Sequence, residues 1–258
     1  MSKYNRTYHL SWSLGATNDD RISNSVDSLL GKEIVITEKL DGENTGMTND
    51  GVYARSHAAF TTSDWSREVR TLHKLKVEDE LGEDVYLFGE NMEGIHSIEY
   101  TNLTSYFYIF GVRDSNIWIP WESVEEYSYL LDIPTVPVLF KGVVNTEKEL
   151  KELTERLASE PSELGGLREG IVVRNAGMFH NDDFADNVMK WVRKGHVQTD
   201  VHWTRNWKNQ GIEINDYPHF KAWFEMIGER PAVKRGCEVL IALRKPLTDN
   251  TAREQLFG

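Results

Sequence analysis

Short segments rich in β-branched and aromatic residues recur through the first three quarters of the chain. Such residues favour pleated, half-buried strands. The predicted strands are residues 33–39, 51–55, 85–90, 106–112, 170–174 and 187–192. The turn sequence Asn49-Asp50-Gly51 leads into the second of them and is typical of a hairpin. The pattern therefore predicts strands up to about residue 192 and none beyond it.

Helical patterns separate these strands and then replace them. Three predicted helices cover residues 63–81, 121–131 and 146–158. The third opens with Thr146 and Glu149 at the spacing of a capping box. Two more predicted helices cover residues 219–227 and 232–243. We therefore predict two domains, residues 1–195 and a helical unit of residues 196–258.

The composition is that of an ordinary globular protein. Of the 258 residues, 40% are hydrophobic and 27% are charged. The single cysteine, Cys237, excludes a disulfide framework and a cysteine-rich zinc site. The chain has no run of 18 apolar residues, and its N-terminus has no apolar signal core. We therefore expect a cytoplasmic protein that does not bind membranes, and we expect a monomer.

The charge is distributed unevenly. The net charge of −12 argues against a nucleic-acid binder, which neutralises phosphates with Lys and Arg. However, residues 1–189 hold 17 basic and 33 acidic residues, a net of −16, whereas residues 190–258 hold 12 and 8, a net of +4. A polyanion could therefore dock on the last quarter of the chain.

The sharpest candidate for chemistry is Lys39, which ends a predicted strand and is followed by Leu40-Asp41-Gly42. A tight turn at this point can direct the amine into a cleft. A nucleophilic lysine must be neutral, so its pKa has to fall by about two units or more from about 10.4. Burial and neighbouring cations have that effect, and Lys190 is a candidate cation. Taken alone, the same string is also an ordinary surface turn.

Five segments, of which this is the first, resemble the motifs of covalent nucleotidyltransferases, the superfamily of ATP-dependent RNA and DNA ligases and mRNA capping enzymes. The segments are Lys39-Leu40-Asp41-Gly42, Phe88-Gly89-Glu90, Tyr106-Phe107-Tyr108-Ile109-Phe110, Glu169-Gly170-Ile171-Val172-Val173-Arg174 and Met189-Lys190-Trp191-Val192-Arg193-Lys194. The resemblance implies an α+β fold, with an ATP-grasp-like core of twisted antiparallel sheets flanked by helices. A small helical C-terminal unit would follow in place of an OB barrel.

Two positions point to RNA ligases within this superfamily. DNA ligases and capping enzymes usually carry Arg two residues after the glycine of the first motif, where this chain has Asn44. Glu38 before the lysine and Arg55 in Tyr53-Ala54-Arg55-Ser56 resemble the nick-sealing RNA ligases of phage type. Residues 8–21 and 193–200 are similar to a bacterial and phage branch of RNA ligases. The host would then be bacterial, or the protein would be encoded by a phage.

The resemblance also assigns the site residues, with ATP and Mg²⁺ (or Mn²⁺) as cofactors. They are Lys39 as the nucleophile that carries AMP, Glu38, Asn44 and Arg55 at the nucleotide or the 5′-phosphate, Glu90 at the ribose, Phe110 at the adenine, Glu169 at the metal, and Lys190 and Lys194 at the phosphates. The implied activity is the joining of an RNA 5′-phosphate to a 3′-hydroxyl through a lysyl-AMP intermediate, in the repair of broken RNA.

Several alternatives remain open at this point. Alternation along a strand selects Lys194 as the second phosphate-binding cation, but Arg193 takes that place if the strand ends early. Phe110 could be a sheet-core aromatic, as could Phe107 and Tyr108. The rival functions are a DNA ligase of the same superfamily and a non-catalytic RNA-binding module on the same fold.

Overall fold

A computed structural model describes residues 3–54, 59–195, 207–211 and 218–238 of the chain. The chain divides into two compact units, Met1–Ile212 and Glu213–Gly258. Arg55, one of the predicted site residues, lies outside the described residues. No helix in the described part of the chain is long and apolar enough to cross a membrane.

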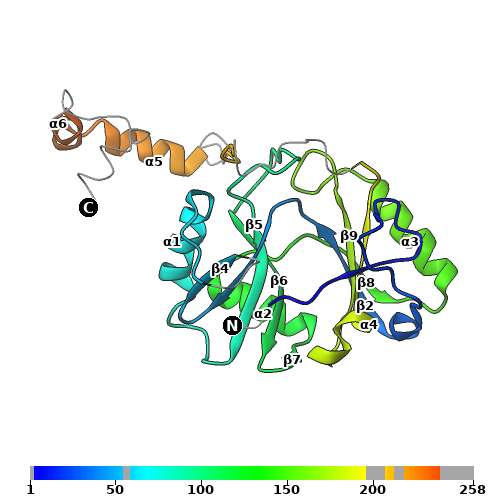
Figure 1. The fold of residues 1–258 in the computed structure, drawn as a ribbon. Helices are drawn as coiled ribbons and strands as arrows, with labels where there is room; N and C mark the ends of the chain where they lie inside the picture. Colours follow the sequence, from blue (N-terminus) through cyan, green and yellow to red (C-terminus); the bar gives the residue numbers. More distant parts are fainter. Residues whose placement is uncertain (1–2, 55–58, 196–206, 212–217, 239–258) are drawn as a thin grey trace. The chain divides into compact units, whose positions relative to one another are not determined.

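The first unit is built on two sheets (Figure 1). The strands of the five-stranded sheet, in spatial order, are β1 (Tyr8–His9), β11 (Val188–Val192), β9 (Gly170–Asn175), β2 (Glu33–Lys39) and β8 (Val138–Val143). Those of the six-stranded sheet are β10 (Phe179–His180), β7 (Ile117–Trp118), β6 (Phe107–Asp114), β5 (Val85–Asn91), β3 (Glu43–Thr48) and β4 (Gly51–Ala54). Apart from the parallel pair β1 and β11, neighbouring strands are antiparallel, as predicted for this core.

The helices lie outside the sheets. They are η1 (Asp27–Leu29), η2 (Asp64–Ser66), α1 (Arg67–Lys76), α2 (Trp121–Leu131), α3 (Glu147–Ser159), η3 (Asn181–Asp183) and α4 (Phe184–Asn187). In Figure 1, α3 lies beside β9 of the five-stranded sheet, whereas α1 lies beside β4 and α2 beside β6 of the other sheet. The predicted mixture of twisted sheets and flanking helices is confirmed.

Local sequence signals predict the bounds of α2 and α3 well and those of α1 less well. The predicted capping box is present, because Thr146 accepts from the Glu149 amide and Glu149 accepts from the Thr146 amide. The helix predicted over residues 121–131 is found as α2. The helix predicted over residues 63–81 is shorter, since η2 precedes α1 and single turns follow Lys76.

Five strands were not predicted. Three of them, β1, β7 and β10, have two residues each, which is too short for an alternating pattern to be recognised, and β3 and β8 each have a physical reason. β3 reads Glu-Asn-Thr-Gly-Met-Thr, a polar sequence without β-branched aliphatic residues. It is held because both of its edges are paired, with β4 and with β5. β8 is an edge strand whose side chains are half-buried or exposed, so its hydrophobic alternation is weak.

Three clusters of buried side chains form the core of the first unit. The largest is dominated by residues of the six-stranded sheet, α1 and α2, and the second lies between the five-stranded sheet, α3 and the N-terminal segment. The third comprises Phe88, Trp118, Phe179, Phe184 and Val188. Phe88, Trp118 and Phe179 belong to one sheet and Val188 to the other, so this cluster joins the two sheets.

The second unit contains the two predicted helices, α5 (Pro218–Gly228) and α6 (Pro231–Glu238). The predicted continuation of α6 to residue 243 lies outside the described residues. On α5, four large apolar side chains are more than half exposed. They are Phe220, Trp223, Phe224 and Met226.

Residues 207–211 belong to the first unit. Lys208 O accepts from Ile95 N at 2.9 Å, and Gln210 N donates to Glu93 O at 2.8 Å. The Gln210 side chain is buried and bonded to main-chain groups of Ile98 and Tyr100. Part of the segment after residue 195 therefore packs on the sheet domain.

Candidate functional site

The site is built around the turn that carries the chain from one sheet to the other. β2 of the five-stranded sheet ends at Lys39, and β3 of the six-stranded sheet begins at Glu43. Asp41 fixes this turn: its Oδ2 accepts from Ser97 N at 2.8 Å, Ser97 Oγ at 2.6 Å and Ile98 N at 2.8 Å. The sequence placed Asp41 in the motif without giving it this role.

Lys39 forms a short ion pair with Glu169. Its Nζ lies 2.7 Å from Glu169 Oε2, and the side chains of Lys39 and Glu169 are 27% and 5% exposed. The pairing of β2 with β9 explains this contact, because Lys39 lies opposite Gly170. A Cβ at position 170 would overlap Trp191 O, so glycine is required where β9 and β11 approach each other.

The charge state of Lys39 differs from the expectation. Burial alone would lower the pKa of Lys39, but the carboxylates of Glu169, Glu90 and Asp41 outweigh burial and raise this pKa. The expectation of a lowered pKa relied on nearby cations. In the protein chain alone, carboxylates surround the amine, and Lys39 is an ammonium ion.

Lys190 lies on the same face of the sheet as Lys39. Lys190 pairs with Val172, which in turn pairs with Thr37. Thr37 is two positions before Lys39 on β2. Positions two apart share a face of a strand, so both lysines point to one side. Val172 packs against the cluster that joins the two sheets, which identifies this side as the one facing the six-stranded sheet.

Glu38 lies on the opposite face. Its side chain is 1% exposed. It accepts from Glu163 N at 3.0 Å and lies 3.5 Å from Arg168 Nε. Burial raises the pKa of Glu38, and Arg168 opposes this shift. The structure therefore does not bring the Glu38 carboxylate to the Lys39 amine.

Asn44 and Glu90 face Lys39 from the other sheet. The two residues pair directly across β3 and β5. Gly42 N donates to Glu90 Oε1 at 3.1 Å, and burial raises the pKa of Glu90 to about 8 although Lys39 opposes this shift. Asn44 Oδ1 is buried without a hydrogen-bond partner in the part of the chain that the structure describes. A buried acceptor of this kind is typical of a site that completes its bonding with a ligand.

Phe110 differs in burial from the other two aromatic candidates. Phe107 and Tyr108 are almost fully buried in the core of the six-stranded sheet. Phe110 is half-buried and packs against both that core and the cluster joining the sheets. Its ring centroid lies 5.0 Å from that of Tyr4 in an edge-on arrangement. Of the three aromatic candidates, Phe110 is thus the one that packs against the cluster joining the two sheets.

The end of β11 bears on the choice between the two cations of the fifth motif. The strand ends at Val192, and Arg193 N donates to Glu169 O at 3.0 Å. Nε and Nη2 of Arg193 are buried and lack a hydrogen-bond partner among the described residues. Lys194 lies in the following turn and is exposed. The early end of the strand favours Arg193 over Lys194 as a group directed at the site.

Glu169 is the candidate metal ligand of this site. The described residues contain no group of three or more His, Cys, Asp and Glu that could hold a metal. Glu169 supplies hard oxygen ligands, which suit Mg²⁺. Mg²⁺ is commonly held by one or two carboxylates together with substrate phosphates. The residues present therefore fit a metal that arrives with a nucleotide and do not form a closed metal cage.

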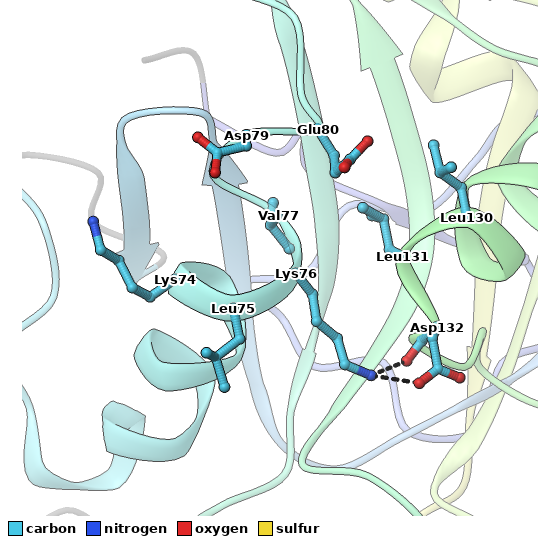
Figure 2. A pocket seen from close by; sticks show the side chains of 9 residues that line it. All are labelled: Lys74, Leu75, Lys76, Val77, Asp79, Glu80, Leu130, Leu131 and Asp132. Atoms are coloured by element: carbon cyan, nitrogen blue, oxygen red, sulfur yellow. Dashed lines mark hydrogen bonds and ion pairs between the residues drawn. The ribbon is translucent and has the colours of Figure 1, made fainter.

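A surface hollow lies away from the Lys39 site. Figure 2 shows this hollow of about 310 Å³, which is lined by side chains from the end of α1, the turn after it and the end of α2. Lys76 Nζ lies 2.7 Å from Asp132 Oδ2 across it. None of its lining residues belongs to the Lys39 group, and it contributes nothing to the candidate site.

Comparisons with known proteins bear on the fold and on the family of this chain. No curated protein matches the chain. An RNA ligase of Naegleria gruberi, solved as a mutant with ATP and Mn, matches with a TM-score of 0.54 and 17% identity over 77% of this chain and 58% of the ligase. An archaeal ATP-dependent RNA ligase matches with a TM-score of 0.50 and 13% identity over 74% of this chain and 48% of the other. At these identities the two structures support the fold.

The family of this chain is shown by a family model, because the sequence identities to the two structures are too low to show it. It describes RNA ligases and matches residues 32–192, which include every strand of the Lys39 site. The chain spans little more than half the length of the Naegleria ligase. On the match to the family model, the chain belongs to the RNA ligase family.

Proposed function

We propose that this protein is an ATP-dependent RNA ligase that works through a lysyl-AMP intermediate. The observation that carries the proposal is the arrangement at the sheet crossover. Lys39 and Lys190 share one face of the five-stranded sheet, and Asn44 and Glu90 pair across the other sheet next to the same turn. One nucleophile, a second cation and two polar groups thus converge where a nucleotide could enter.

The reaction would proceed in three transfers. Lys39 Nζ attacks the α-phosphate of ATP, and pyrophosphate leaves. The AMP then passes to the 5′-phosphate of an RNA end, and a 3′-hydroxyl finally displaces AMP to form the phosphodiester. Phosphoryl transfer depends mainly on positioning and charge stabilisation, which suits a site whose cations come from rigid strands.

The remaining residues would hold the nucleotide. Glu90 would accept from the ribose hydroxyls, Phe110 would stack on the adenine, and Asn44 would contact the phosphates or the ribose. Lys190 would bind phosphate oxygens, together with Arg193 or Lys194. The predicted contacts of Arg55 and of the Glu38 side chain are the least supported, since the first is outside the described residues and the second faces away.

Binding of substrate would also have to change the state of Lys39. While Lys39 is paired with Glu169 at 2.7 Å, its amine is in the charged ammonium form, which has no lone pair and cannot attack. ATP phosphates bound near Lys190 would offer new partners to the cations of the site. Glu169 would hold Mg²⁺ or Mn²⁺, which supplies neutralisation of phosphate charge during transfer. Lys39 would be released when Glu169 takes that partner.

RNA is the proposed polynucleotide substrate. The charge of +4 in residues 190–258 and the exposed apolar side chains of α5 favour a role of this segment in binding RNA. We keep residues 1–195 as the adenylylation domain and residues 196–258 as the RNA-binding unit in this proposal, although residues 207–211 pack on the first unit. We propose that the protein is a monomer, that it acts in a bacterial cytoplasm, and that it seals nicks in RNA duplexes.

Labelling with ATP tests the first transfer. With α-labelled ATP and Mg²⁺, wild-type protein should become covalently labelled on Lys39, and Lys39→Ala should lose the label. Lys141→Ala is the matched control because Lys141 lies on β8 of the same sheet in a 2.7 Å pair with Glu125. Label retained by Lys39→Ala would show that the nucleophile is assigned wrongly.

Sealing assays test the substrate. Matched nicked duplexes with an RNA or a DNA strand at the 3′-hydroxyl side, and single strands of the same sequence, should be compared in one experiment. We expect RNA ends to be sealed faster than DNA ends. Preference for an all-DNA nick would favour the rival DNA ligase. Absence of pyrophosphate release from ATP would favour a non-catalytic RNA-binding module.

A further inference from the structure

A loop near the N-terminus packs beside Lys190 and has no role in the site described above. β1 pairs in parallel with β11, so that His9 lies opposite Lys190. The chain then returns, and His9 forms an isolated bridge with Ile22. This return brings Asp20 next to both His9 and Lys190, although Asp20 and Lys190 are 170 positions apart in the sequence.

The two oxygens of the Asp20 carboxylate have different partners. Oδ2 accepts from Thr17 N at 3.1 Å and from Thr17 Oγ1 at 2.9 Å, which closes a tight turn. Oδ1 lies 3.4 Å from His9 Nε2 and 3.9 Å from Lys190 Nζ. Asp20 is therefore held in place through Thr17, and its second oxygen is directed at the lysine.

His9 links the same carboxylate to the end of β11. The His9 side chain is buried, and its Nδ1 lies 2.8 Å from Ser13 Oγ. Ser13 Oγ in turn accepts from Val192 N at 2.9 Å. Asp20 is thus connected to β11 at two places, directly at Lys190 and through His9 and Ser13 at Val192.

We propose that Asp20 is a positioning residue for Lys190, which it holds toward the cleft between the sheets. A lysine side chain has a flexible four-carbon stem, so a fixed acceptor beside its ammonium group limits where the charge can go. The proposal rests on the proposed function, since phosphate binding is the task assigned to Lys190.

A different reading of the same residues is excluded by their contacts. Ser13, His9 and Asp20 form a chain of contacts in the order of a hydrolase triad. However, the His9 side chain is 2% exposed, and Ser13 Oγ already accepts from Val192 N. A serine engaged in this way has no open face for a substrate carbonyl, so the network serves to hold the strand.

Asp20→Asn is the variant that tests the proposal. Thr17 N can only donate, so the amide oxygen of asparagine should stay on Thr17, and its NH₂ group should face Lys190 in place of an acceptor. Single-turnover adenylylation with labelled ATP should slow by about tenfold to a hundredfold, since misplacement by about 1 Å can cost about a hundredfold in rate. Asp19→Asn is the matched control, because Asp19 is exposed and accepts from Arg6 through its main-chain oxygen.

A double-mutant cycle separates positioning from a purely structural role. If Asp20 acts through Lys190, then Asp20→Asn combined with Lys190→Gln should adenylylate as Lys190→Gln does, within about twofold. Effects that multiply instead would overturn the proposal. Thermal melting of each variant, read beside these rates, shows whether a slower reaction comes from a smaller folded fraction.

Acylation of lysines gives a readout that does not need ligase activity. With acetic anhydride at limiting concentration and mass spectrometry, Lys190 should react several-fold faster in Asp20→Asn than in wild type, with Lys141 as the internal reference. The reason is that a carboxylate favours the unreactive charged form of a neighbouring amine. Unchanged Lys190 reactivity would overturn the contact. Failure of wild-type protein to label with ATP would instead count against the proposed function, and the acylation result would still decide the inference.

Discussion

Removal of the Lys39 amine should destabilise the folded protein as well as abolish its labelling. Lys39→Ala leaves Glu169, which is 5% exposed, without its partner at 2.7 Å. Removal of one member of a buried pair costs about 3–5 kcal/mol, because the other charge stays buried and uncompensated. Lys39 itself is 27% exposed, so solvent screens part of the loss, and we expect the lower end, about 3 kcal/mol.

The assay is urea unfolding followed by tryptophan fluorescence at pH 7.5. Lys141→Ala breaks a pair of the same length in which both side chains are about 40% exposed, and it should cost at most about 1 kcal/mol. Adding Glu169→Gln to Lys39→Ala should recover most of the loss, because the buried charge is then gone. The reasoning is refuted if Lys39→Ala costs no more than Lys141→Ala, or if the second substitution recovers nothing.

Three further predictions concern the fold around the site. Burial raises the pKa of Glu90 to about 8, so the folded protein keeps a proton that the unfolded chain loses above about pH 4.5. The free energy of unfolding should therefore fall as the pH rises from about 4.5 to 8, and Glu90→Gln should flatten that decline in urea unfolding. Thr146→Ala should cost about 1 kcal/mol through loss of the α3 cap, whereas Thr146→Ser should cost little on thermal melting. Gly170→Ala should severely lower soluble expression and melting temperature because its Cβ would overlap Trp191 O, whereas Gly177→Ala meets only Asn175 Oδ1 at 3.4 Å and should be tolerated.

Where local chemistry decides an element, the sequence was sufficient to predict it. The strand over residues 33–39 is found as β2, since its buried aliphatic run has no competing structure. The capping box at Thr146 specifies where α3 begins. β3 could not be read in this way, because its polar residues become a strand only through pairing on both edges. Such pairing depends on residues far away in the chain.

The same division holds within the site. Alternation along β2 already implied that Glu38 and Lys39 point to opposite faces, yet the family motif placed both at the nucleotide. The structure pairs Lys39 with Glu169, places Lys190 on the same face of the sheet, and leaves the Glu38 side chain with Arg168. Periodicity was the signal that could have separated Glu38 from the others.

The position of Asp20 shows what sequence spacing alone cannot predict. No local pattern links it to Lys190, because their contact arises from the parallel pairing of β1 with β11 and the return of the chain past His9. A second long-range pairing, that of β2 with β9, places Glu169 next to Lys39 and makes this amine more basic instead of less. In the proposed reaction, the lysine motif specifies which atom would react. Strand register determines the carboxylates from which that atom would first have to be released, so the proposed control of the reaction lies in long-range pairing that the motif does not contain.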